Sequence, residues 1–140
     1  MIAKMIRGRG FGGLARYLAA GRTGQEVGRI AWAEARNLPS AHPRDAALFM
    51  RVTAAEAPQV RRPVYHLSLA WDPSDRVDRT QIVAIADRVL RDLGLEGHQA
   101  LLVAHSDTAH PHVHVMVNPS TRRPDGRGLG GTTIGRSRKS

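Results

Sequence analysis

The sequence predicts an α+β fold in which helices cover one face of a mainly antiparallel sheet. In two segments, 64–71 and 112–118, apolar residues occupy every second position and a different set of side chains lies between them. This alternation is typical of strands whose two faces differ. A third segment, 82–93, repeats its apolar residues at helical spacing. The predicted order of elements is β, α, β, α, β, α, β, β, which favours one sheet with helices over one face and a polar open face.

The first half of the chain is expected to supply two strands and two helices. Gly8 to Gly13 should break the first strand, and Gly21 should end the first helix. The second strand is predicted although its alternation is poor. The second helix follows Pro43 and is expected to bury Ala47 and Leu48. The predicted ranges are strand 1–7, helix 14–20, strand 25–32 and helix 44–56.

The second half contains the clearest patterns. In segment 64–71 the large apolar residues share one face, while His66 and Ser68 share the other. Asp78 and Gln81 are spaced as a capping box, which predicts the start of a helix that Gly94 ends. Strands are then predicted over 99–104 and 112–118.

Composition limits the class of protein. The 140 residues suit one compact domain, and no stretch has the length of a signal peptide or a membrane span, so we expect a cytoplasmic protein without membrane insertion. Because the chain has no cysteine, any metal site must use histidine and carboxylate ligands.

The charge predicts a polyanionic partner. The formal net charge is +9 and the sequence pI is about 11.4. Part of the excess lies in the segment 119–140, which is rich in glycine and arginine and contains a single acidic residue, Asp125. We therefore divide the chain into a domain over 1–118 and a basic C-terminal segment over 119–140, interpreted as a flexible or truncated end or a phosphate-contacting arm.

A histidine-rich stretch from 103 to 118 carries the candidate chemistry. On a strand, His112 and His114 would point to the same side, and His105 would reach them across a short loop. Three neutral imidazoles can hold a divalent ion with open coordination positions. Asp107 would orient one of these imidazoles, bind the ion or form an Asx turn. His110 is interpreted as a DNA contact or a solvated loop residue.

Tyr17, at the edge of the first predicted helix, is the candidate nucleophile. With a metal site and a basic surface, an accessible phenol fits transesterification of a nucleic-acid phosphodiester. A phenol needs the field of the metal or a base to attack, and His105 backed by Asp107 is the candidate base. The alternative role of Tyr17 is to pack at the edge of the core.

Three blocks of the sequence resemble the conjugative relaxases, or plasmid mobilisation nucleases, of the HUH endonuclease superfamily. His112-Val113-His114 matches the histidine pair for which the superfamily is named. Segments 10–18 and 66–71 resemble the nucleophile block and the second block. The tyrosine precedes the histidine pair, as in relaxases and unlike the replication initiators and transposases of the superfamily.

The resemblance implies a fold, an activity and site residues. The fold would be the palm-like sheet of HUH endonucleases. Tyr17 would attack single-stranded DNA at an origin of transfer and become linked to the 5′ phosphate, and His105, His112 and His114 would hold Mg²⁺ or Mn²⁺, with Zn²⁺ as a further candidate. Ser68 would position the DNA. The other candidate DNA contacts are His66, Arg9, Arg16, Arg122 and Arg123, and accessory relaxosome proteins are the expected protein partners.

Other functions stay open on the sequence alone. The chain could be a non-catalytic, basic DNA-binding module whose histidines hold a structural metal, which would require a closed site of four ligands. It could also be a truncated, inactive relaxase, because relaxases of this kind continue beyond the metal block. A metal-dependent oxygenase or isomerase would leave the positive charge unexplained.

Overall fold

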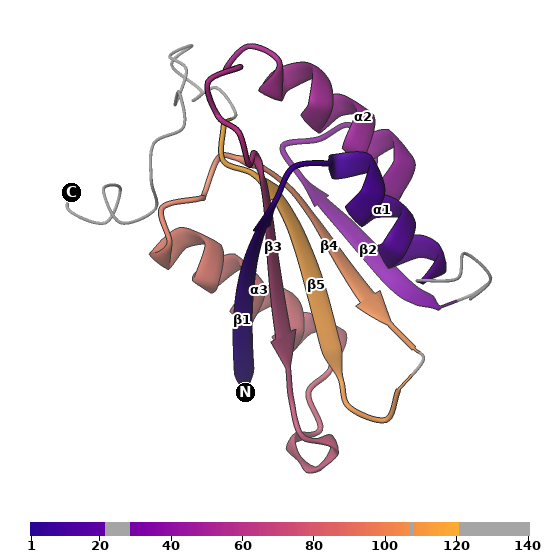
Figure 1. Cartoon of the computed structure of the whole chain (residues 1–140). Coiled ribbons are helices and arrows are strands. Elements are labelled where there is room, and N and C mark those ends of the chain that lie inside the picture. The colour runs from indigo at the N-terminus through magenta and orange to yellow at the C-terminus, as the bar shows by residue number, and fades with distance from the viewer. Residues whose placement is uncertain (22–28, 107, 121–140) are drawn as a thin grey trace.

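The computed structural model of the protein describes residues 1–21, 29–106 and 108–120. Each predicted strand and helix has a counterpart in this part of the chain, with ends shifted by a few residues (Figure 1). The elements are β1 (Ile2–Gly8), α1 (Phe11–Ala20), β2 (Ile30–Arg36), α2 (Pro43–Ala54), β3 (Val64–Ala70), the 3-10 turn η1 (Pro73–Asp75), α3 (Arg79–Asp92), β4 (Gln99–His105) and β5 (His112–Asn118).

The strands form one sheet in the order β1-β3-β5-β4-β2, and all four neighbouring pairs are antiparallel. The predicted α+β class with an antiparallel sheet is therefore confirmed. The helices, however, divide between both faces: α1 and α2 cover one, and α3 covers the other (Figure 1). The reason is that β4 is apolar on both sides, with Leu101 and Leu102 both fully buried, so both faces need cover.

The face under α3 holds the larger core. Ile82, Ala86 and Leu90 of α3 belong to the same buried cluster as the valines Val113 and Val115 of β5. The capping box at the start of α3 forms as predicted: the backbone N–H of Gln81 donates to the Asp78 side chain at 2.8 Å, and the backbone N–H of Asp78 donates to the Gln81 side chain at 2.9 Å. This helix packs on one face of the three inner strands, β3, β5 and β4.

The opposite face is packed by α1 and α2. Phe11 and Leu18 of α1 and Met50 of α2 lie in one buried cluster with residues of β4 and β5. The prediction that α2 buries Leu48 is wrong, because that side chain is 49% exposed. Ala46, Ala47 and Met50 face the sheet instead, and this phase turns Leu48 outward.

An irregularity in β2 explains why its alternation was poor. Ile30 pairs with His105 and Trp32 with Ala104, so an extra residue is inserted between these pairs. As a result Ile30 packs on the α1 side of the sheet and Trp32 on the α3 side, although both positions have the same parity. The predicted strand over 25–32 was therefore placed too early, and residues 25–28 of it lie outside the described residues.

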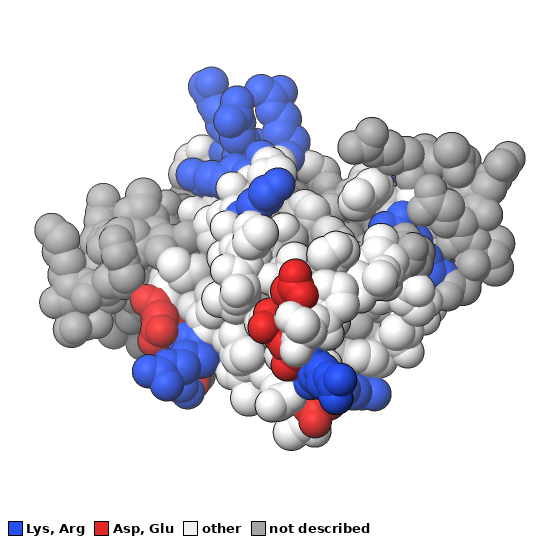
Figure 2. Space-filling view, turned by 90° about the horizontal axis from the view of Figure 1, so that it is seen from below, with Lys and Arg blue, Asp and Glu red and all other residues white. Residues whose placement is uncertain are grey.

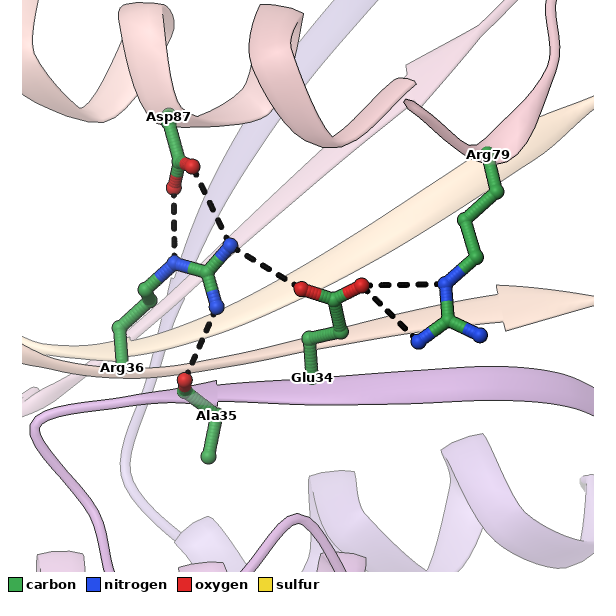
Figure 3. A network of polar contacts seen from close by, with 5 residues as sticks. All are labelled: Glu34, Ala35, Arg36, Arg79 and Asp87. Atoms are coloured by element: carbon green, nitrogen blue, oxygen red, sulfur yellow. Dashed lines mark hydrogen bonds and ion pairs between the residues drawn. The ribbon is translucent and has the colours of Figure 1, made fainter. Parts of the chain in front are cut away.

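A network of charged side chains joins β2 to α3 (Figure 3). Arg36 donates to both carboxylate oxygens of Asp87, at 3.0 and 3.1 Å, and also contacts Glu34. Glu34 in turn accepts from Arg79, whose guanidinium lies over the Trp32 ring. Hydrogen bonds to Asp87 raise the pKa of Arg36, which keeps the pair charged. The edge strand is thus tied to the helix by a bidentate contact.

We predict that Asp87→Asn lowers the free energy of unfolding by about 1 kcal/mol, because it removes the charge from a partly exposed bidentate pair. Chemical denaturation at low salt measures the change. Asp92→Asn is the matched control on the same helix, since its contact with Arg88 is 3.9 Å long and exposed. Equal losses in the two variants would contradict the special role of the pair.

Candidate metal and nucleophile site

The strand β5 presents its histidines to the face that α1 covers. Val113, Val115 and Val117 point toward α3 and are fully buried, so the alternation of the strand turns His112 and His114 the other way. The apolar residues thereby fix the register: a shift by one residue would bury the imidazoles under α3.

The end of β4 supplies the third histidine. His114 pairs with Val103, and His105 lies two residues beyond Val103 on the same face. The ring centroid of His105 lies 4.7 Å from that of His114 and 5.4 Å from that of His112. One nitrogen from each of the three rings lies within 4.8 Å of the others. The structure therefore brings together the three histidines that the sequence suggested as ligands.

The hydrogen bonds of His105 define which nitrogen carries the lone pair. Its Nε2 lies 2.8 Å from the carbonyl oxygen of Leu18, which can only accept, so Nε2 carries the proton. The lone pair is therefore on Nδ1, which lies 3.1 Å from Nη2 of Arg29. A backbone carbonyl that fixes the tautomer in this way is the usual second partner of a metal-binding histidine.

The other two imidazoles are held in a similar way. Nδ1 of His112 donates to the carbonyl oxygen of His110 at 2.9 Å, which leaves the lone pair on Nε2. Nδ1 of His114 lies 2.8 Å from Nε2 of His66. For His114 to offer Nε2 to an ion, its Nδ1–H must donate to His66. His112 and His114 thus each have Nδ1 engaged by the chain and Nε2 as the candidate ligand atom.

Burial keeps His114 and His66 neutral. It is the largest cause that lowers the pKa of His114 to about 3, and positive charge on the neighbouring histidines and on Arg29 lowers it further. Burial also lowers the pKa of His66. Since a metal binds the neutral imidazole, the environment holds these side chains in the form that a ligand requires.

Tyr17 lies on the same face, on the last turns of α1. Its ring is edge-on to that of His114, with centroids 6.4 Å apart, and the Arg29 guanidinium lies 5.2 Å from its centroid. The residue after it, Leu18, is the one whose carbonyl holds His105. The helix that carries the candidate nucleophile is therefore joined directly to a candidate ligand.

The remaining candidates divide into three groups. Ser68 of β3 pairs with His114 and shares its face, as does His66, so both lie beside the histidine cluster. Arg9 and Arg16 are exposed, and His110 is an exposed residue of the β4–β5 connection. The candidates Asp107, Arg122 and Arg123 lie outside the described residues.

Arg29 is a site residue that the sequence analysis did not find. It falls in the predicted strand 25–32, yet it is 8% exposed and contacts His105. No motif of the sequence marks this contact, because it depends on the irregular pairing at the start of β2. A buried arginine beside polar rings can be found only from the fold.

On the face seen in Figure 2, charge is grouped rather than continuous. Figure 2 shows basic side chains in separate groups, two of which adjoin acidic ones, with uncharged surface between them. Among the described residues, no helix combines the length and the apolar character needed to cross a membrane.

Comparison with known proteins identifies the family. Residues 21–126, about three quarters of the chain, match the family described as relaxase, MobA/VirD2-like, nuclease domain. The chain belongs to this family. The match includes the three candidate ligands of this relaxase domain, whereas Tyr17 precedes the matched residues, so its assignment depends on the geometry above.

Two relatives are proteins named TraI from Escherichia coli. One is 30% identical over 90 residues, covering 64% of this relaxase chain and 12% of the relative, and the other is 27% identical over 126 residues, covering 84% and 16%. The chain thus spans less than a fifth of either relative.

A solved structure has the same fold. It comes from a study entitled "Molecular Basis of Vancomycin Resistance Transfer in Staphylococcus aureus". It matches 91% of this relaxase chain and 74% of its own, with a TM-score of 0.59 and 10% sequence identity. At that identity the likeness supports the fold alone.

We predict that the metal-free protein loses stability as the pH falls below about 6.5. His114 has an ordinary pKa of 6.5 when unfolded and about 3 when folded, so the unfolded state binds a proton first. Its contribution is complete above pH 6.5 and decreases toward pH 3, with a slope of about 1.4 kcal/mol per pH unit.

Denaturation in EDTA across this range measures the slope. A His114→Gln variant should show a shallower dependence than the wild type, whereas His110→Gln, at an exposed position, should keep the wild-type dependence. If His114→Gln and the wild type change in parallel, the histidine is not buried in its neutral form.

Proposed function

We propose that this relaxase domain nicks one strand of DNA at a plasmid origin of transfer and becomes linked to it through Tyr17. The observation that carries the proposal is the position of the Tyr17 ring, 6.4 Å from the ring of His114 and on the same face as His105 and His112. The membership of the family supports the same chemistry.

In this proposal the phenolic oxygen of Tyr17 attacks the scissile phosphorus. The new bond joins that oxygen to phosphorus, and the bond from phosphorus to the 3′ oxygen breaks. The phenolic proton leaves to solvent, and water protonates the 3′ oxygen as it departs. The products are a 5′-phosphotyrosyl link and a free 3′ hydroxyl, so the bond energy is kept for rejoining.

The histidines fit a divalent ion with open positions. The described residues supply three imidazole nitrogens within 4.8 Å of one another, rather than the four ligands of a closed structural site. We propose that His105, His112 and His114 hold Mg²⁺ or Mn²⁺, with Zn²⁺ as a third candidate. When bound, such an ion would neutralise charge on the non-bridging phosphate oxygens.

We assign His105 to the ligand set rather than to the role of base. Its Nε2–H already donates to the carbonyl oxygen of Leu18, and its Nδ1 accepts from Arg29. His66 then positions His114 through their contact, and Ser68 lies where it could donate to a phosphate or a base of the DNA. Accessory relaxosome proteins and a cytoplasmic location stay predictions.

A non-catalytic DNA-binding module is the second candidate function. The basic character of the chain and its exposed arginines fit both functions. Only the relaxase proposal gives a purpose to the position of Tyr17 beside the histidines. The two candidates therefore differ in one product, a covalent link to DNA.

We predict that Tyr17→Phe abolishes formation of a covalent DNA adduct while leaving DNA binding within about threefold of the wild type, because it removes one hydroxyl. The probe is a random-sequence, single-stranded oligonucleotide library with a 3′ label, incubated with Mg²⁺ or Mn²⁺ and separated on a denaturing gel.

Tyr65→Phe is the matched control. The chain has two tyrosines, and Tyr65 is buried among the residues under α3, on the other face of the sheet. It should form the adduct as the wild type does. An adduct that persists in Tyr17→Phe would refute the assignment, and absence of any adduct in the wild type would favour the binding module or an inactive relaxase.

A further inference from the structure

Arg29 contacts both the candidate nucleophile and one of the candidate ligands. It directly precedes β2, and its carbonyl oxygen accepts from the backbone N–H of Ser106 at 2.8 Å, which fixes it beside the end of β4. Its guanidinium lies 3.1 Å from Nδ1 of His105 and 5.2 Å from the centroid of the Tyr17 ring. One buried cation thus contacts both parts of the site.

This contact uses the lone pair that His105 would offer to an ion. Because Nε2–H donates to Leu18, the only ring lone pair of His105 is on Nδ1, and Nη2 of Arg29 donates to it. One lone pair cannot accept from a guanidinium and bind an ion at the same time. The positive charges of the Arg29 guanidinium and of a divalent ion would also repel each other strongly in a partly buried site. Arg29 must therefore leave Nδ1 when His105 becomes a ligand.

We propose that Arg29 is a phosphate-binding catalytic residue, which rests on His105 in the absence of an ion and moves to the scissile phosphate when an ion binds. This inference rests on the proposed nicking function. The phosphate must lie within reach of both the Tyr17 hydroxyl and the histidine cluster, and Arg29 already contacts Tyr17 and His105. A guanidinium donates two parallel hydrogen bonds to phosphate oxygens and stabilises the charge that develops on them.

The first test measures Mn²⁺ affinity by calorimetry without DNA. Arg29→Met keeps an unbranched apolar stem and removes the competing donor and charge, so Mn²⁺ should bind about tenfold more tightly. Arg36→Met, at the other end of β2 and on the α3 side, should leave the affinity unchanged. His112→Ala should weaken it. An unchanged or weaker affinity in Arg29→Met would mean that Arg29 only supports the site, and would overturn the proposal.

The second test measures the affinity for a random-sequence, single-stranded oligonucleotide in a Tyr17→Phe background. With Mg²⁺ present, Arg29→Met should weaken DNA binding by about tenfold, because a phosphate contact is lost. In EDTA the loss should be small, because Arg29 then rests on His105. An equal loss in both conditions, or no loss in either, would overturn the proposal.

A measurement on the protein without an Arg29 substitution covers the case in which Arg29→Met fails to fold. The Nε–H resonance of Arg29 in NMR spectra should shift during a titration with Mg²⁺, and a resonance that stays fixed at saturation would overturn the proposal. All three tests read binding rather than nicking. They can therefore fail while the Tyr17 adduct forms, or succeed in a protein that forms none.

Discussion

The hydrogen bond from Nε2 of His105 to the carbonyl oxygen of Leu18 is the contact on which the site depends. It joins the last turn of α1 to the end of β4, two segments that are 87 residues apart in sequence. It fixes the tautomer of His105, so that the lone pair is on Nδ1. It also fixes the part of α1 that carries Tyr17, because Tyr17 directly precedes Leu18. A single contact therefore sets both the ligand and the nucleophile.

Burial and charge give the site its chemical character. The valines of β5 are buried under α3, which forces the histidines to the opposite face, and burial there keeps His114 neutral. The described cation of this cluster is the guanidinium of Arg29. Imidazole ligands beside a guanidinium suit a site that must accept both a divalent ion and an anionic phosphate.

Alternation and spacing were sufficient to predict most of the fold. The buried faces of β3 and β5 and the capping box of α3 are local patterns, and the structure contains them as predicted. The sequence prediction of an open polar face was wrong because it followed the polar positions of β3 and β5. The continuous apolar run of β4 is the pattern that indicates cover on both faces. For the site, the pair His112 and His114 follows from strand periodicity. Arg29 and the Leu18 carbonyl reach His105 only through long-range contacts and a bulge in β2, which no local pattern reveals.

The central claim is that an ion held by imidazoles from β4 and β5 faces the hydroxyl of Tyr17 from α1. A crystal grown with Mn²⁺ and measured at a wavelength where manganese scatters anomalously tests it most directly. The account predicts one strong peak bonded to a nitrogen from each of His105, His112 and His114, with the Tyr17 hydroxyl on the same side of the sheet. A peak that misses these three rings, or a Tyr17 hydroxyl turned away from it, would contradict the account.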